Sequence, residues 1–205
     1  MEDTQRFTTE QECKIYNNPT IDKIAGTYTG SVRIIGSGKT LWEDYVKSEE
    51  LMSGTDTIAV NLSAMVIPLV THLFSWHHKQ IGHIKGWRRA EWCDEKSIVH
   101  SVKEGSNIDH VWRFNGGTSV SGLSAIDLAW LLGYRRIALV GIPMDHNGYF
   151  CKPNDNPDMH DKYRHGEIRY LHGFYKDSVR SFSGVTKDIM GEPTKQWLEE
   201  KYVEL

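Results

Sequence analysis

Glycines and hydroxyl side chains are concentrated in one short segment whose chemistry suits the binding of a phosphate group. Residues 116–122 read GGTSVSG and precede an apolar stretch with helical periodicity. Adjacent glycines let the backbone approach a ligand closely, and the free N–H groups at a helix N-terminus bind anions. Serine and threonine also cap helices that bind nothing. The flanking glycines favour ligand contact and predict these nucleotide-binding residues: Gly117, Thr118, Ser119 and Ser121.

A second glycine turn lies nearer the N-terminus. Residues 36–40 read GSGKT and follow a short β-branched run. A phosphate-binding P-loop would require a glycine where the chain has Arg33. The dinucleotide-binding fingerprint fails as well, because no third glycine follows at the required spacing. The segment predicts either a tight turn that merely requires glycine or a contact with phosphate or ribose through Gly36, Ser37 and Gly38.

Ionisable and amide side chains at other expected strand ends supply further candidates. Asn61 follows one β-branched run, and Asp145 and His146 follow another such run. Histidine can take a proton from a hydroxyl group near neutral pH, so Asp145 and His146 in this loop, and His160, His165 and His172 in the polar segment after it, are candidates for catalysis. Each histidine could equally be a solvated surface residue. Arg180 would pair its planar guanidinium with a phosphate or form a surface ion pair.

Histidine is abundant in this chain, with ten copies, but the sequence predicts no metal site. The spacing of His77, His78, His83 and Cys93 does not match a zinc site. The three cysteines are far apart and odd in number, so we expect neither a disulfide framework nor a CxxC pair. This cysteine usage favours a reducing compartment, the cytoplasm.

Strands alternate with helices along the chain, which is typical of a mostly parallel sheet with helices on both faces. The expected strands are residues 31–35, 57–60, 69–76, 97–102, 111–114, 136–140 and 178–182. The expected helices are residues 39–50, the apolar stretch that ends at Leu132, and residues 160–176 and 185–200. We therefore predict the α/β class, with a single Rossmann-like domain over residues 31–205 and an N-terminal extension over residues 1–30. Parallel strands would bring the predicted site residues to one edge of the sheet.

The composition excludes some classes of partner. The net charge of −3 lacks the basic excess of a protein that binds nucleic acid or a membrane surface through charge. No apolar run is long enough to span a bilayer, and the acidic, polar first residues do not resemble a secretory signal. We therefore expect no membrane association. The glycine- and hydroxyl-rich turn at residues 116–122, rather than the composition, favours a nucleotide as the small-molecule partner.

The order of these motifs resembles the bacterial sialyltransferase family that includes the Campylobacter enzymes. The resemblance extends over roughly residues 32–191 and rests on these residues: GSG at 36–38, Asn61, GTS at 117–119, LGY at 132–134 and GI at 141–142. The chain is also similar to a related Rossmann-like group typified by archaeal hydroxymethylpterin diphosphokinase, and to short phage and prophage proteins. A likeness of this kind is more specific for the fold than for the reaction.

The resemblance implies a sugar-nucleotide site. Such sialyltransferases use cytidine-monophosphate-linked sialic acid and require no metal. Residues 36–38 would then lie near the donor phosphate, and Asn61 would contact the nucleotide or the sugar. Thr118, Ser119 and Ser121 would hold the nucleotide or the carboxylate of the sugar.

We therefore expect a nucleotide-sugar-dependent, glycosyltransferase-like enzyme that transfers a glycosyl group to an acceptor hydroxyl. The acceptor would be a glycan or a modified base, and no cofactor is expected beyond the donor. The resemblance implies a histidine general base after the Gly-Ile loop, so we predict His165 as the residue that takes the acceptor proton, with His160, His146 and Asp145 as further catalytic candidates. A phage-encoded chain would work in the host cytoplasm, and a homo-oligomer is a further expectation. Two alternatives stay open: pyrophosphoryl transfer or nucleotide hydrolysis, which would require magnesium, and a non-enzymatic binding or assembly protein that reuses the fold.

Overall fold

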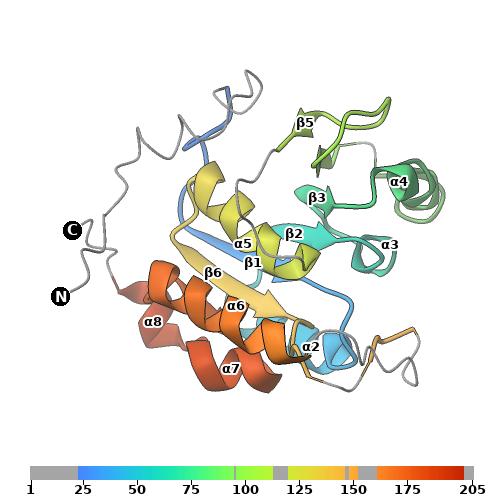
Figure 1. The fold of residues 1–205 in the computed structure, drawn as a ribbon. Coiled ribbons are helices and arrows are strands. Elements are labelled where there is room, and N and C mark those ends of the chain that lie inside the picture. The colour runs from blue at the N-terminus through green and yellow to red at the C-terminus, as the bar shows by residue number, and fades with distance from the viewer. Residues whose placement is uncertain (1–22, 95, 113–119, 146–147, 152–160, 201–205) are drawn as a thin grey trace.

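A seven-stranded, all-parallel sheet forms the centre of the molecule (Figure 1). The structure is a computed structural model, and it describes residues 23–94, 96–112, 120–145, 148–151 and 161–200. The strands are β1 (Ser31–Ile35), β2 (Asp56–Val60), β3 (His72–Ser75), β4 (Ile98–Ser101), β5 (His110–Val111), β6 (Arg136–Val140) and β7 (Val179–Ser181). These strands and their helices confirm the predicted α/β, Rossmann-like class.

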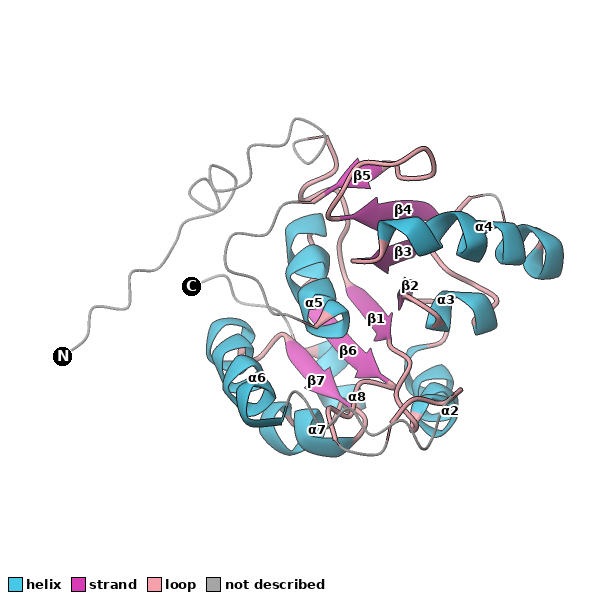
Figure 2. Ribbon diagram, turned by 45° about the vertical axis from the view of Figure 1, so that its right-hand side comes forward, coloured by secondary structure: helices cyan, strands magenta, loops and turns pink. Residues whose placement is uncertain are grey.

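Helices cover both faces of the sheet, as Figure 2 shows. They are α2 (Leu41–Met52), α3 (Ser63–Val66), α4 (His78–Trp92), α5 (Ser121–Leu132), α6 (Asp161–Tyr175), α7 (Gly184–Met190) and α8 (Lys195–Glu199). Alternate residues of β6 point to opposite faces: Ile137 and Leu139 pack with α5 and α6, whereas Ala138 and Val140 pack with α2. Every residue of β6 is buried, as expected for a central parallel strand with both faces covered.

The order of the strands reverses between β1 and β6. The sheet order is β5-β4-β3-β2-β1-β6-β7, so the chain first builds outward from β1 to β5. It then returns through α5, which packs across β1, β2 and β3, and enters β6 on the other side of β1. In open α/β sheets, ligands bind beside the carboxyl ends of the strands at such a reversal. The topology therefore places the candidate site beyond Ile35 and Val140.

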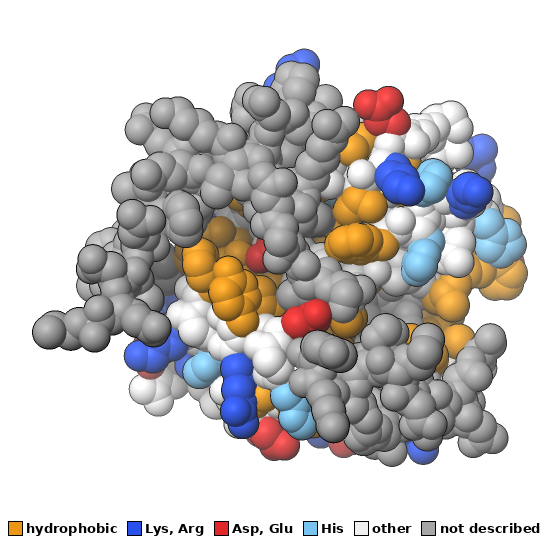
Figure 3. Space-filling view, in the orientation of Figure 1, with side chains coloured by type: hydrophobic (Ala, Val, Ile, Leu, Met, Phe, Trp, Pro, Cys, Tyr) orange, Lys and Arg blue, Asp and Glu red, His pale blue; other side chains and the backbone are white. Residues whose placement is uncertain are grey.

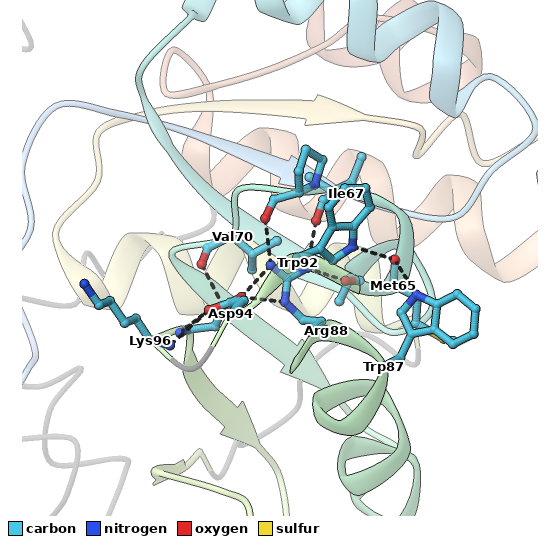
Figure 4. A network of polar contacts seen from close by, with 11 residues as sticks. Met65, Ile67, Val70, Trp87, Arg88, Trp92, Asp94 and Lys96 are labelled. Atoms are coloured by element: carbon cyan, nitrogen blue, oxygen red, sulfur yellow. Dashed lines mark hydrogen bonds and ion pairs between the residues drawn. The ribbon is translucent and has the colours of Figure 1, made fainter. Parts of the chain in front are cut away.

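The sequence pattern does not predict α4, although it is one of the longer helices of the described chain. Its buried face carries Ile81 and Ile84 and then Arg88, an arginine where a helical pattern would place an apolar residue. The Arg88 guanidinium donates to the carbonyls of Ile67, at 2.7 Å, and Pro68, at 3.0 Å. It also forms an ion pair with Asp94, which lies beside it in Figure 4. These bonds attach α4 to the connection between α3 and β3 and satisfy the buried charge.

A chain of buried hydrogen bonds crosses the sheet from β5 to β2. The Trp112 indole donates from Nε1 to Nδ1 of His100 at 2.7 Å, and Nε2 of His100 lies 3.0 Å from Nδ1 of His72. Nε2 of His72 lies 3.3 Å from the Tyr134 hydroxyl, which donates to Oδ2 of Asp56 at 2.7 Å. An indole can only donate and a carboxylate can only accept. Both imidazoles must therefore be neutral, with the hydrogen on Nε2.

Burial favours the same neutral state of these histidines. It lowers the pKa of His72 to about 4, a shift that the Asp56 charge opposes and His110 reinforces. Burial also lowers the pKa of His100 well below its usual range, and His72 and His110 add to the effect. Both rings are fully buried and neither lines the cavity described below, so both are structural residues of the core.

Residues 23–30, which the sequence places in the N-terminal extension, pack against the domain. Backbone N–H groups of Gly26 and Tyr28 donate to the carbonyls of Leu131 and Leu132, each at 2.9 Å. The Tyr28 ring stacks on Tyr134 with ring centroids 5.4 Å apart. This part of the expected extension therefore belongs to the folded body. None of the helices in the described ranges combines the length and the apolar character needed to cross a membrane.

Candidate functional site

A cavity of about 480 Å³ opens at the carboxyl edge of the sheet, where the strand order reverses. Its walls come from the ends of β1, β2 and β6 and from the N-termini of α4 and α5. The lining includes residues 36–38, 60–62, 120–122 and 141–145, with His77, Gln80, Gly148, Tyr149 and Cys151. Small-molecule sites typically occupy about 300–1,000 Å³ and lie at such reversals, so this cavity is the candidate site.

The two glycines of the first turn serve close packing between loops. The N–H group of Gly36 donates to the Val140 carbonyl and that of Gly38 to the Gly141 carbonyl, each at 2.8 Å. A Cβ atom on Gly38 would lie 2.5 Å from Cδ of Pro143. Both glycines line the cavity, but their N–H groups already have protein acceptors. The glycine requirement is therefore explained by the contact between the loops after β1 and β6.

Ser37, between these glycines, is the residue of the turn that offers an unused polar atom. Its hydroxyl oxygen is buried, and the structure provides no hydrogen-bond partner for it among the described residues. A buried hydroxyl without a partner loses its hydration without compensation. The hydroxyl of a cavity-lining residue in this state suits a ligand acceptor.

The N-terminus of α5 contributes backbone donors to the same cavity. Val120 at the N-cap makes no side-chain cap bond, and its carbonyl accepts from the N–H groups of Leu123, at 3.0 Å, and Ser124, at 2.9 Å. Within the described chain, the N–H groups of Ser121 and Gly122 have no acceptor. These two N–H groups can donate to an anion. Since α5 is 12 residues long, the partial positive charge at its N-terminus also favours an anion there.

Asn61 is held in a defined orientation at the end of β2. Its backbone adopts a positive φ of 54°, and its N–H group donates to the Phe74 carbonyl at 3.0 Å. The Ser75 hydroxyl donates to Oδ1 of Asn61 at 2.7 Å and accepts from the N–H group of His77 at 3.0 Å. The amide oxygen of Asn61 already accepts a hydrogen bond. The side chain, which lines the cavity, therefore offers a ligand its amide nitrogen as a hydrogen-bond donor.

Asp44 organises the site from behind, and the sequence analysis missed it. This fully buried residue of α2 accepts at Oδ2 from the N–H group of Gly141 at 2.9 Å. The same oxygen accepts from the hydroxyls of Thr40, at 3.0 Å, and Ser183, at 2.5 Å. It thereby joins segments that follow β1, β6 and β7. Its signal in the sequence is an acid on the apolar face of a helix, three residues after Leu41.

The predicted catalytic residues fall in different places. Asp145 lines the cavity, whereas His165 is exposed on α6 and is not among the lining residues. Arg180 also lies outside the lining, and its guanidinium donates to the carbonyls of Lys176 and Val179, each at 2.9 Å. The remaining predicted residues lie outside the described part of the chain: His146, Gly117, Thr118 and Ser119.

His77 is a cavity residue that the sequence analysis did not predict to be catalytic. It lies at the N-cap of α4, and Gln80, one turn later, lines the same wall. No group of three or more potential metal ligands occurs among the described histidines, cysteines and acids. Because His77 follows the expected strand at residues 69–76, the sequence placed it at the same edge as the other strand ends, but it was interpreted as a structural or substrate-side residue.

Comparison with known proteins does not assign the chain to a family. No protein-family model matches the chain, and a search of curated proteins finds no match.

Proposed function

We propose that this chain is a glycosyltransferase-like enzyme that binds a nucleotide sugar in the switch-point cavity and transfers its glycosyl group to an acceptor hydroxyl. One observation carries the proposal. The Ser37 hydroxyl and the Ser121 and Gly122 N–H groups are unpaired donors at one cavity, within the described chain. Such a set suits the phosphate of a nucleotide, because phosphate oxygens accept hydrogen bonds from neutral donors and from helix N-termini.

The same donors would assist the chemical step. When a glycosyl group leaves a nucleoside phosphate, negative charge grows on the phosphate oxygen, and donors already in place lower the barrier. The described lining contains the carboxylate of Asp145 and neither lysine nor arginine. The neutral donors would therefore carry this stabilisation in the described part of the site, which suits a donor with a single phosphate. The resemblance to the sialyltransferases makes a cytidine monophosphate sugar the first candidate.

Other cavity residues suit the rest of the donor. Asn61 presents an amide donor to the nucleotide or the sugar. Val120, Ile142 and Met144 provide an apolar wall, as pockets for small molecules usually have beside a few polar groups. The acceptor would be a glycan or a modified base.

A thermal-shift screen tests the proposal. The purified chain is heated with nucleoside mono-, di- and triphosphates and with sugar nucleotides, each with and without magnesium. A ligand that binds only the folded state raises the melting temperature. We expect a metal-independent shift with cytidine monophosphate and its sugar conjugates. The absence of a shift with every nucleotide would refute the proposal.

A serine pair makes the test specific to the cavity. Ser37→Ala should weaken nucleotide binding about 10-fold or more, because a hydrogen bond to a charged group contributes about 1.5–3 kcal/mol. Ser106→Ala is the matched control, since Ser106 is exposed and outside the cavity lining. Calorimetric titration measures both variants. Equal affinity in Ser37→Ala and the wild type would remove this hydroxyl from the site.

The same screen separates the two alternatives. A magnesium-dependent shift would support pyrophosphoryl transfer or nucleotide hydrolysis. The carboxylate of Asp145, which lines the cavity, would then be a ligand of the magnesium ion. A binding or assembly protein is favoured instead by the exposed aromatic residues of α6, Tyr170 at 66% and Phe174 at 48% exposure. Figure 3 shows hydrophobic side chains gathered in patches on the face that carries α5 and α6. A stable oligomer without nucleotide affinity would support that alternative.

A further inference from the structure

The cavity has a second polar wall, separate from the unpaired donors beside β1 and α5. It is formed where β3 ends and α4 begins, and it carries His77 and Gln80. Neighbouring strands lie about 4.8 Å apart, so β3, two strands from β1, is displaced from it by about 10 Å. That span leaves room for a sugar ring between a phosphate at Ser37 and a group bound at this wall.

Hydrogen bonds fix the backbone of His77, whereas its imidazole ring is available to bind a ligand. The His77 N–H group donates to the Ser75 hydroxyl at 3.0 Å, and its carbonyl accepts from the Gln80 N–H group at 2.8 Å. Its side chain makes no cap bond to α4, and the structure places no hydrogen-bond partner against the imidazole among the residues it describes. Helix N-caps are usually serine, threonine, aspartate or asparagine. The ring does not serve as the helix cap, and it is exposed at the cavity, where a ligand can reach it.

Other described histidines are less well placed. His72 and His100 are buried in the hydrogen-bond chain of the core. His78 and His83 lie on α4 and His165 on α6, and the cavity lining contains none of them. Among the described histidines, His77 alone lines the cavity.

We propose that His77 is the general base for the acceptor hydroxyl and that Gln80 positions that hydroxyl. The inference rests on the proposed transferase function and deepens it. The acceptor oxygen forms a bond to the anomeric carbon of the sugar while the bond from that carbon to the phosphate oxygen breaks. The hydroxyl proton passes to a ring nitrogen of His77, and the departing nucleoside phosphate keeps the electron pair. Gln80 lies three residues after His77 and lines the same cavity wall, so its side-chain amide is placed to bind the acceptor beside His77.

The test uses His77→Gln and His77→Ala in the full chain, with His78→Gln as the neighbouring control outside the lining. Affinity for cytidine monophosphate is measured by calorimetric titration. Turnover is measured as nucleotide release from cytidine monophosphate sialic acid, with lactose or water as the acceptor. We expect nucleotide affinity to change less than about threefold and kcat to fall about 10²–10⁴-fold, the usual contribution of a general base. The acidic limb of the pH–rate profile should disappear in both His77 variants and persist in His78→Gln.

The outcomes separate this inference from the proposed function. If the wild type binds the nucleotide and releases it from the sugar, but the His77 variants keep the wild-type rate and pH profile, the assignment of His77 is overturned while the transferase proposal stands. If the His77 variants lose affinity and rate equally, His77 holds the donor rather than the proton. A wild type that binds no nucleotide, or binds it without any release, overturns both.

Discussion

Acidification should destabilise this fold through the buried histidines of the core. Burial lowers the pKa of His72 from 6.5 to about 4, so the unfolded chain binds a proton more readily than the folded one. The stabilising effect of the neutral ring is complete above pH 6.5 and is lost as the pH falls toward 4. Between pH 7 and pH 5 the shift corresponds to a loss of about 2 kcal/mol in the free energy of unfolding. The lowered pKa of His100 acts in the same direction.

One carboxyl group opposes this effect. Burial of Asp127 raises its pKa from 3.8 to about 6, although the hydrogen bond from the Tyr175 hydroxyl at 2.5 Å limits the shift. A raised carboxyl pKa makes the folded state gain stability as the pH falls through this range. Between pH 7 and pH 5 the gain is about 1 kcal/mol. The wild type should therefore show only part of the histidine effect.

The Asp127→Asn variant should reveal the full destabilisation by the buried histidines at low pH, because it removes the opposing carboxyl group. Urea unfolding at pH 7 and pH 5 measures the free energy of unfolding of the wild type, Asp127→Asn and His78→Gln, a control on the surface of α4. We expect Asp127→Asn to lose about 1 kcal/mol more than the wild type over this interval, and His78→Gln to follow the wild type. If Asp127→Asn is as stable at pH 5 as at pH 7, the buried histidines do not exchange protons as argued.

Two substitutions test the architecture of the site. Gly38→Ala should lower the free energy of unfolding by about 1–3 kcal/mol, because its Cβ atom would lie 2.5 Å from Cδ of Pro143 and 2.8 Å from the Gly141 carbonyl. Gly86→Ala, in the interior of α4 with no atom within 4 Å of the new Cβ, should instead stabilise the chain by about 0.5–1 kcal/mol, and urea unfolding compares the two. Asp44→Ala should cost about 2–3 kcal/mol, because it leaves the buried Gly141 N–H group without its acceptor. It should also weaken nucleotide binding, and a variant with wild-type stability and affinity would remove Asp44 from its organising role.

Local pattern was enough to locate most of the strands and several helices. The predicted bounds of β1 and β6, residues 31–35 and 136–140, agree with the structure, because short β-branched runs between glycines and polar turns carry their own signal. The pattern failed at α4. There Gly82 and Gly86 weaken the helical signal, and Arg88 occupies a buried position that is satisfied only by carbonyls and a carboxylate distant in sequence.

The candidate site was predicted in part. Ser37, Asn61, Ser121 and Asp145 line the cavity, as expected from residues that follow strands or begin a helix in a parallel sheet. The sequence could not show that the N–H groups of Gly36 and Gly38 would bond to carbonyls after β6, because those contacts join segments about 100 residues apart.

By itself, then, the sequence determined the alternation of strands and helices and the polar groups at their ends, because these depend on short-range periodicity and turn chemistry. The tertiary structure decided the order of the strands, and with it which ends meet. It left His165 on an exposed helix outside the cavity lining, and it set Asp44 behind three loops. These outcomes depend on packing between elements distant along the chain, which no local pattern encodes.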